Sequence, residues 1–183
     1  MRITDIADKY RTGEENPISL LDRIYAKIES DNLNDFISLT KNIAYEQAYM
    51  SKKRHDEKKP LSEIDGMFFS IKDNIAVENI RMTCGSKILS DFISPYNATV
   101  VERIIEKGGI IVGKNNMDEF AMGSSNETSY FGPVKNPADT SYVPGGSSGG
   151  SAASVASSHA CISIASDTGG SVRQPASFCG VTG

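Results

Sequence analysis

VPGGSSGGSAASVASSHACISIASDTGGSVR, residues 143–173, is the stretch from which the fold and the site of this chain are inferred. Two loops rich in glycine and serine, residues 145–151 and 167–171, bracket a run of small and apolar residues. Glycine loses much conformational entropy on folding, so dense glycine indicates backbone that turns sharply or approaches another group closely. The two loops therefore predict a site built from backbone N–H groups and serine hydroxyls.

Helical and strand patterns alternate on both sides of these loops. Helical patterns cover residues 98–107, 149–158 and 172–178, and short apolar strand patterns cover residues 66–71, 109–113 and 160–165. Continuous apolar runs such as 109–113 are typical of strands buried on both faces. Helices that alternate with such strands predict an α/β fold.

The first sixty residues are mainly helical. Helical patterns cover residues 4–11, 17–30 and 41–57, with a strand candidate at residues 35–40. Pro60 ends the third helix, because proline lacks the N–H that a helix needs. The basic run at residues 52–59 is interpreted as a solvated helix end rather than a nucleic-acid patch. We expect residues 1–60 to form an N-terminal helical segment that packs on a core beginning at residue 61.

Composition excludes several classes of protein. The formal net charge is −4, which gives no global basic field for nucleic acid. Three cysteines without a C-x-x-C pair indicate reduced thiols and a cytoplasmic location. We see no signal peptide, and no apolar run approaches the roughly 20 residues of a membrane span. No membrane partner is therefore expected.

Three familiar motifs fit the loops poorly. Residues 145–149 match G-x-S-x-G, but a serine hydrolase of that kind needs a histidine base later in the chain. Only His55 and His159 are present, and His159 lies inside the run of small residues. The lysine of a phosphate-binding P-loop is missing. Residues 167–169 match an aspartic-protease triplet, but no paired carboxylate accompanies them.

The second loop has the composition of an oxyanion-binding loop. Ser171 follows Thr168, Gly169 and Gly170 at the expected start of a helix. Consecutive backbone N–H groups at a helix start stabilise a developing negative charge. We therefore expect the N–H groups of these four residues to form an oxyanion hole.

A serine nucleophile needs a base, and lysine is the candidate where histidine is scarce. Lys72 ends a predicted buried strand. To act near neutral pH its pKa must fall by about 3 units, which requires a buried, polar-lined position. Ser147 would then bridge Lys72 and the nucleophile Ser171.

These residues resemble the amidase signature family. Both G-G-S-S-G-G-S and D-T-G-G-S-V-R-Q-P are present, and Ser147 and Lys72 lie 24 and 99 residues before Ser171, as in that family. The resemblance implies an amidase signature fold, a mixed β-sheet core covered by helices on both faces. It also implies a Ser–Ser–Lys triad, in which Ser171 is the acyl-enzyme nucleophile, Ser147 relays the proton beside a cis peptide, and Lys72 is the base.

Residues 116–127 and 129–137 further resemble the subfamily of A subunits of glutamyl-tRNA(Gln) amidotransferases. This resemblance implies glutamine as substrate, no cofactor in this chain, and two further subunits in a heterotrimer. ATP and magnesium are expected on a partner subunit, which amidates glutamate carried on tRNA with the ammonia released. Members are more than twice as long, so we expect an N-terminal fragment that ends before the core domain is complete and is inactive alone. A stand-alone amidase acting on small amides, and an inactive scaffold, remain alternatives.

Several further residues have two interpretations. Ser124, Ser125 and Asn126 are candidates for the substrate pocket. Arg173 and Gln174 either line the substrate cleft or brace the loop. Asp73 and Asn74 either tune Lys72 or end the strand, and Asp167 is expected to accept hydrogen bonds from nearby backbone N–H groups.

Overall fold

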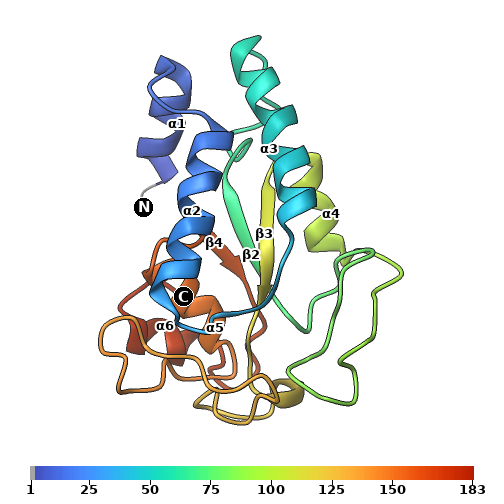
Figure 1. Cartoon of the computed structure of the whole chain (residues 1–183), viewed down its shortest axis with the longest axis vertical. Coiled ribbons are helices and arrows are strands. Elements are labelled where there is room, and N and C mark those ends of the chain that lie inside the picture. Colours follow the sequence, from blue (N-terminus) through green and yellow to red (C-terminus); the bar gives the residue numbers. More distant parts are fainter. Residues whose placement is uncertain (1–2) are drawn as a thin grey trace.

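The computed structural model describes residues 3–183 and contains one four-stranded mixed β-sheet with helices packed around it (Figure 1). The helices are α1 (Ile3–Thr12), α2 (Pro17–Asp31), α3 (Lys41–Asp56), α4 (Thr99–Glu106), α5 (Gly149–Ala156) and α6 (Arg173–Cys179), with a 3₁₀ helix, η1 (Glu119–Ala121). The strands are β1 (Phe36–Leu39), β2 (Phe68–Lys72), β3 (Ile110–Asn115) and β4 (Ile162–Ile164). The α/β class predicted from the sequence is confirmed.

The sheet has the strand order β1-β3-β2-β4. β2 is parallel to both β3 and β4, whereas β1 is antiparallel to β3. Lys72 at the end of β2 pairs with Asn115 at the end of β3. The carboxyl ends of the three parallel strands therefore meet at one edge of the sheet, where α/β proteins usually place their ligand sites.

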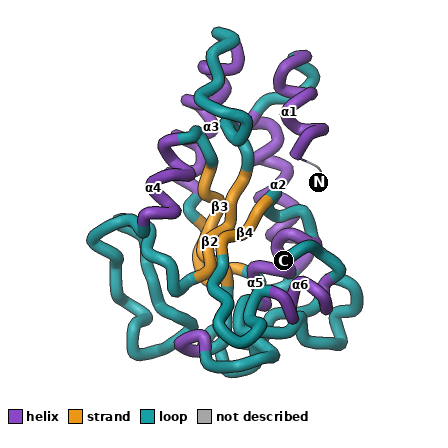
Figure 2. Tube along the Cα trace, turned by 180° about the vertical axis from the view of Figure 1, so that it is seen from behind, coloured by secondary structure: helices purple, strands orange, loops and turns teal. Residues whose placement is uncertain are grey.

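Helices α2 and α3 cover one face of the sheet in Figure 1, and the view from behind shows the strands flanked by α4 and α5 (Figure 2). The Tyr25 hydroxyl of α2 donates a hydrogen bond of 3.1 Å to the carbonyl of Val112 in β3. Leu21, Phe68 and Ile110 are fully buried in one apolar cluster that joins helices and sheet. Phe68 and Ile110 are the first residues of β2 and β3, so this core holds the end of the strands opposite the polar loops.

A local sequence signal accounts for the start of α2. Pro17 occupies the first turn of α2, and the Asn16 side chain accepts hydrogen bonds from the N–H groups of Ile18 and Ser19. Such an N-cap satisfies donors that the helix itself leaves without partners.

Two strands differ from the sequence prediction. β3 continues to Asn115, so Lys114 and Asn115 belong to the buried sheet rather than to the following loop. β4 is only half-buried, contrary to the expectation of a fully buried strand, because it forms the edge of the sheet within the described residues.

The expected division at residue 60 stays a prediction. β1, from the first part of the chain, pairs with β3 from the second, so the N-terminal part contributes a strand as well as helices. None of the helices between residues 3 and 183 has the length and apolar character needed to cross a membrane.

Candidate active site

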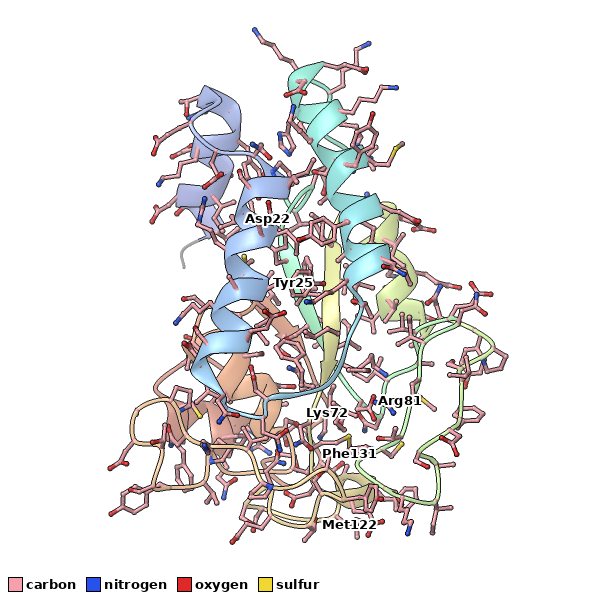
Figure 3. The ribbon with its side chains drawn as sticks, viewed as in Figure 1. Asp22, Tyr25, Lys72, Arg81, Met122 and Phe131 are labelled. Carbon is pink, nitrogen blue, oxygen red and sulfur yellow. The ribbon has the colours of Figure 1, made fainter. Side chains whose placement is uncertain are left out.

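Lys72, the last residue of β2, lies where the loops gather below the sheet (Figure 3). Its side chain is completely buried. Its Nζ donates hydrogen bonds to Ser147 Oγ (2.8 Å), Ser166 Oγ (3.0 Å) and the Ser166 carbonyl (3.3 Å). Within residues 3–183 no carboxylate lies within ion-pair distance of this amine, so hydroxyl and carbonyl oxygens are its polar partners.

Burial lowers the pKa of Lys72 to about 8, against the opposing effect of the Asp118 and Asp167 carboxylates and the Cys84 thiol. An amine with that pKa is neutral in about a tenth of molecules at pH 7, compared with roughly 0.03% for an ordinary lysine. A neutral Lys72 can accept a proton from Ser147 across the same 2.8 Å contact.

Ser147 is fully buried and follows a cis peptide bond between Gly146 and Ser147. The Ser147 carbonyl accepts a hydrogen bond of 3.2 Å from the Asp118 N–H. A Cβ at position 146 would overlap the Asp118 carboxylate, so only glycine fits beside this serine. The close approach explains why the loop is so rich in glycine.

Ser171 is half-buried and lies two residues before α6. Its carbonyl accepts a hydrogen bond of 3.1 Å from the N–H of Ser148, so the backbones of the two serine loops are in contact. In the described part of the chain, the Ser171 hydroxyl makes no hydrogen bond to Ser147. The structure therefore forms the Lys72–Ser147 link of the predicted relay and leaves the Ser147–Ser171 link unformed.

Asp167 organises the second loop through its carboxylate. This carboxylate accepts hydrogen bonds from the N–H groups of Gly170 (2.7 Å), Val172 (2.9 Å) and Arg173 (3.1 Å). The hydrogen bond from the Arg173 guanidinium, followed by these N–H groups, holds the pKa of Asp167 well below its usual range. The prediction that Asp167 binds local backbone N–H groups is confirmed.

These contacts correct the expected oxyanion hole. The Gly170 N–H is engaged by Asp167, so it is not a free donor as the sequence predicted. The N–H groups of Thr168, Gly169 and Ser171 make no hydrogen bond within residues 3–183 and keep that role as candidates.

The predicted substrate-binding residues differ in their exposure to solvent and in their partners. The Arg173 side chain is 68% exposed and forms an ion pair with Asp167, which matches the bracing alternative. Ser124 is exposed and Ser125 is half-buried. Asn126 is buried, and its side-chain oxygen accepts a hydrogen bond of 3.2 Å from the N–H of Gly150 in α5. A substrate contact by these residues stays a prediction.

Sequence reasoning missed Ser166. Its hydroxyl lies 3.0 Å from both Lys72 Nζ and Asn74 Nδ2, so it holds the lysine amine in place. Asn74 thereby contacts the lysine indirectly, while Asp73 turns away and pairs with Lys114 at 3.1 Å. Ser166 directly precedes the second loop, but its 94-residue separation from Lys72 leaves no local pattern to find.

A groove of about 760 Å³ runs along β4, α5 and α6. Ser148 and Val172, which follow Ser147 and Ser171, contribute to its lining, as does Ala165 next to Ser166, whereas Ser147 and Ser171 do not. No group of three His, Cys, Asp or Glu side chains suited to a metal ion occurs in residues 3–183.

The buried Lys72 amine therefore lies on serine hydroxyls, beside the second serine loop and at the carboxyl edge of the sheet. The profile of the amidase family matches residues 19–183, and the chain belongs to this family. A curated relative from Chlamydia felis, the A subunit of its glutamyl-tRNA(Gln) amidotransferase, is 48% identical over 174 residues. That match covers 94% of this chain and 35% of the relative, so the chain spans about a third of the relative's length.

Solved structures show the same fold. The A subunit of the glutamyl-tRNA(Gln) amidotransferase from Thermotoga maritima is 38% identical, with a TM-score of 0.78 over 98% of this chain and 36% of that one. A protein described as a vestigial complex that reveals the origins of an s-triazine catabolic enzyme is 32% identical, with a TM-score of 0.94. That match covers 98% of this chain and 40% of the other. The expected amidase signature fold is thus confirmed for the described part of the chain.

Proposed function

We propose that this chain is the N-terminal part of the glutamine-hydrolysing subunit of a glutamyl-tRNA(Gln) amidotransferase. The observation that supports this most strongly is the contact of 2.8 Å between the buried Lys72 amine and Ser147, next to the loop that carries Ser171. The name and 48% identity of the Chlamydia felis relative support the substrate class.

In the proposed reaction, Ser171 Oγ attacks the side-chain amide carbon of glutamine. The Ser171 hydroxyl first turns toward Ser147; its proton passes to Ser147 Oγ, which gives its own proton to the neutral amine of Lys72. The N–H groups of Thr168, Gly169 and Ser171 stabilise the oxyanion of the tetrahedral intermediate. The C–N bond then breaks, ammonia leaves with the proton returned through Ser147, and a γ-glutamyl ester remains on Ser171 until water hydrolyses it.

The proposed ammonia acceptor lies on a partner subunit. That subunit binds ATP and magnesium and amidates glutamate carried on a glutamine tRNA, and a third subunit completes a heterotrimer. This chain itself uses no cofactor in the scheme, because lysine and serine supply the acid–base chemistry. The support is the name of the relatives, which refers to a multi-subunit amidotransferase.

The test uses the whole gene product reconstituted with its partner subunits. Ser171→Ala should abolish the glutamine-dependent reaction and leave the reaction with free ammonia intact, because the partner's chemistry does not need this hydroxyl. Ser177→Ala, an exposed serine of the neighbouring helix α6, is the matched control and should retain both reactions. Loss of both reactions in Ser171→Ala would contradict the proposal.

A second candidate function is that of a stand-alone amidase acting on small amides. The TM-score of 0.89 to a solved structure named as an amidase, which is 30% identical, is above the 0.78 for the amidotransferase subunit and favours it. A gene product that hydrolyses simple amides alone, and leaves glutamine untouched in the reconstituted complex, would establish this candidate instead.

We also propose that residues 1–183 alone lack full activity. Within the described residues, β4 has one unpaired edge, and the groove beside the serine loops is open. Such edges and apolar surfaces favour association rather than a stable site. Full glutaminase activity from residues 1–183, measured beside the whole gene product, would refute this.

A further inference from the structure

The loop that carries Ser147 is attached to the segment that carries Ser171 on both sides of Ser147. The N–H of Gly146, one residue before it, donates to Gln174 Oε1 at 2.9 Å. The N–H of Ser148, one residue after it, donates to the Ser171 carbonyl at 3.1 Å. The backbone position of Ser147 relative to Ser171 is therefore set by two hydrogen bonds, of which one uses a side chain.

That side chain, Gln174, contacts both serine loops. It lies in the first turn of α6, and its own N–H donates to the Gly170 carbonyl at 2.8 Å. Its amide oxygen accepts the hydrogen bond from Gly146. One residue thus joins the loop at residues 167–171 to the loop at residues 145–151.

The contact between the first loop and α6 is tight enough to require glycine. Gly145 has φ of +87°, a conformation that other residues rarely adopt. A Cβ at this position would lie 2.9 Å from Gln174 Oε1 and 3.1 Å from both Pro175 Cα and Phe178 Cδ2. The glutamine amide therefore occupies a closely fitted place against the loop rather than a loose position on the surface.

We propose that Gln174 is a positioning residue that holds Ser147 within reach of Ser171. Ser147 must contact Lys72 on one side and Ser171 on the other, and the hydrogen bond to Lys72 fixes only the first. The Gln174–Gly146 hydrogen bond fixes the second by tying the loop to α6. This inference rests on the proposed function, because it assigns Gln174 a part in the same proton relay.

The size of the effect follows from the geometry of catalysis. A displacement of about 1 Å in a reacting group can cost roughly 100-fold in rate. Gln174→Met keeps the length of the side chain and removes the acceptor, whereas Gln174→Glu keeps an oxygen acceptor for the Gly146 N–H. Ser147 should therefore be held less firmly near Ser171 in Gln174→Met and should keep its position in Gln174→Glu.

The test measures how fast a fluorophosphonate probe labels Ser171 in the whole gene product, together with kcat and KM for glutamine in the reconstituted complex. In Gln174→Met the probe should label Ser171 at least about tenfold more slowly. The kcat for glutamine should fall, with little change in KM. Gln174→Glu should label within about threefold of the unmodified protein, since it preserves the hydrogen bond. Should Gln174→Met not fold, Gln174→Ala takes its place with the same expectation.

Gln47→Met is the matched control. Gln47 Oε1 accepts a hydrogen bond of 2.8 Å from the N–H of Ile111, at the opposite end of β3 from Asn115. Gln47→Met removes the same kind of hydrogen bond at a place far from the serines. It should reduce thermal stability about as much as Gln174→Met does and leave the rate of Ser171 labelling unchanged.

The outcomes separate the two proposals. No labelling of Ser171 in the unmodified protein would refute the proposed nucleophile, and with it the proposed function. Normal labelling that Gln174→Met does not slow would overturn only the role of Gln174. An equal slowing in Gln47→Met, or a tenfold loss in Gln174→Glu, would overturn that role as well.

Discussion

Two buried lysines lie on adjacent strands near the carboxyl edge of the sheet, and their partners differ. Lys72 ends β2, and Lys114, on the adjacent β3, is paired in register with Ile71. Both side chains are completely buried. Lys114 Nζ lies 3.1 Å from Asp73 Oδ1, whereas the hydrogen bonds of Lys72 Nζ within residues 3–183 go to oxygens of Ser147 and Ser166.

The two lysine amines differ in whether a carboxylate compensates for their burial. Burial lowers the pKa of Lys114, and the Asp73 carboxylate opposes that effect directly. Burial lowers the pKa of Lys72 to about 8, and no carboxylate of the described chain pairs with its amine to restore it. A neighbouring carboxylate favours the charged form of a buried amine, and uncharged hydroxyl partners supply no such compensation.

The largest expected effect is on the reaction rate. Lys72→Met should lower glutamine hydrolysis by roughly 10²–10⁴-fold, the usual contribution of a general base. Because the polar partners of the amine are uncharged hydroxyl and carbonyl oxygens, the free energy of unfolding should be unchanged or higher. Steady-state glutaminase assays and denaturant unfolding of the same preparation check both expectations. Retained activity would remove Lys72 from the mechanism.

Lys114→Met should show the opposite pattern. It leaves the Asp73 carboxylate buried without its cation, which costs about 3–5 kcal/mol of folding stability. The double variant Asp73→Asn with Lys114→Met should recover most of that loss, since the introduced amide oxygen can still accept from the N–H of Thr83. Chemical denaturation of the single and double variants measures this, and equal stability of the two would contradict the structural role.

Folding stability should depend on pH through Lys72. Its folded pKa of about 8 lies below its ordinary value of 10.5, so the unfolded chain binds more protons between these values. The free energy of unfolding should therefore rise with pH across this window, by about 3 kcal/mol. Below pH 8 the destabilisation caused by burying the protonated Lys72 amine is fully present. Unfolding curves of the unmodified protein and Lys72→Met at pH 7 to 10.5 give the difference. Parallel curves would show that Lys72 does not titrate in this range.

The smallest expected effect concerns Asp118. Its carboxylate raises the pKa of Lys72 against the effect of burial. Asp118→Asn removes that charge, so the rise of activity with pH should move to lower pH by less than about one unit. The pH profile of kcat/KM checks the direction, and a shift to higher pH would contradict it.

Much of the fold could be predicted from the sequence because its signals are local. Apolar runs marked β2 and β3, and Pro17 stands at the start of the helix predicted over residues 17–30. The sequence predicts a short helical turn over residues 117–122, and η1 lies inside it, but the left-handed conformation of Phe120 had no local signal. The antiparallel pairing of β1 with β3 was also unpredictable, since it depends on contacts distant in sequence.

The site was predictable to a smaller extent. Lys72 and Ser147 were identified by their spacing from Ser171, and the structure joins them. The use of the Gly170 N–H by Asp167 was missed, although both features were noted separately, because loop conformation decides which donor a carboxylate reaches. The Lys114–Asp73 pair carried a usable signal, since both residues follow the apolar part of neighbouring parallel strands.

The groove beside β4 has one more consequence. Its lining includes Ala165 and Val172, each adjacent to a residue that faces the lysine or the oxyanion loop. Ile162 and Ser163 of β4 line the same groove, so a polypeptide that paired with the open edge of β4 in the described structure would lie next to it.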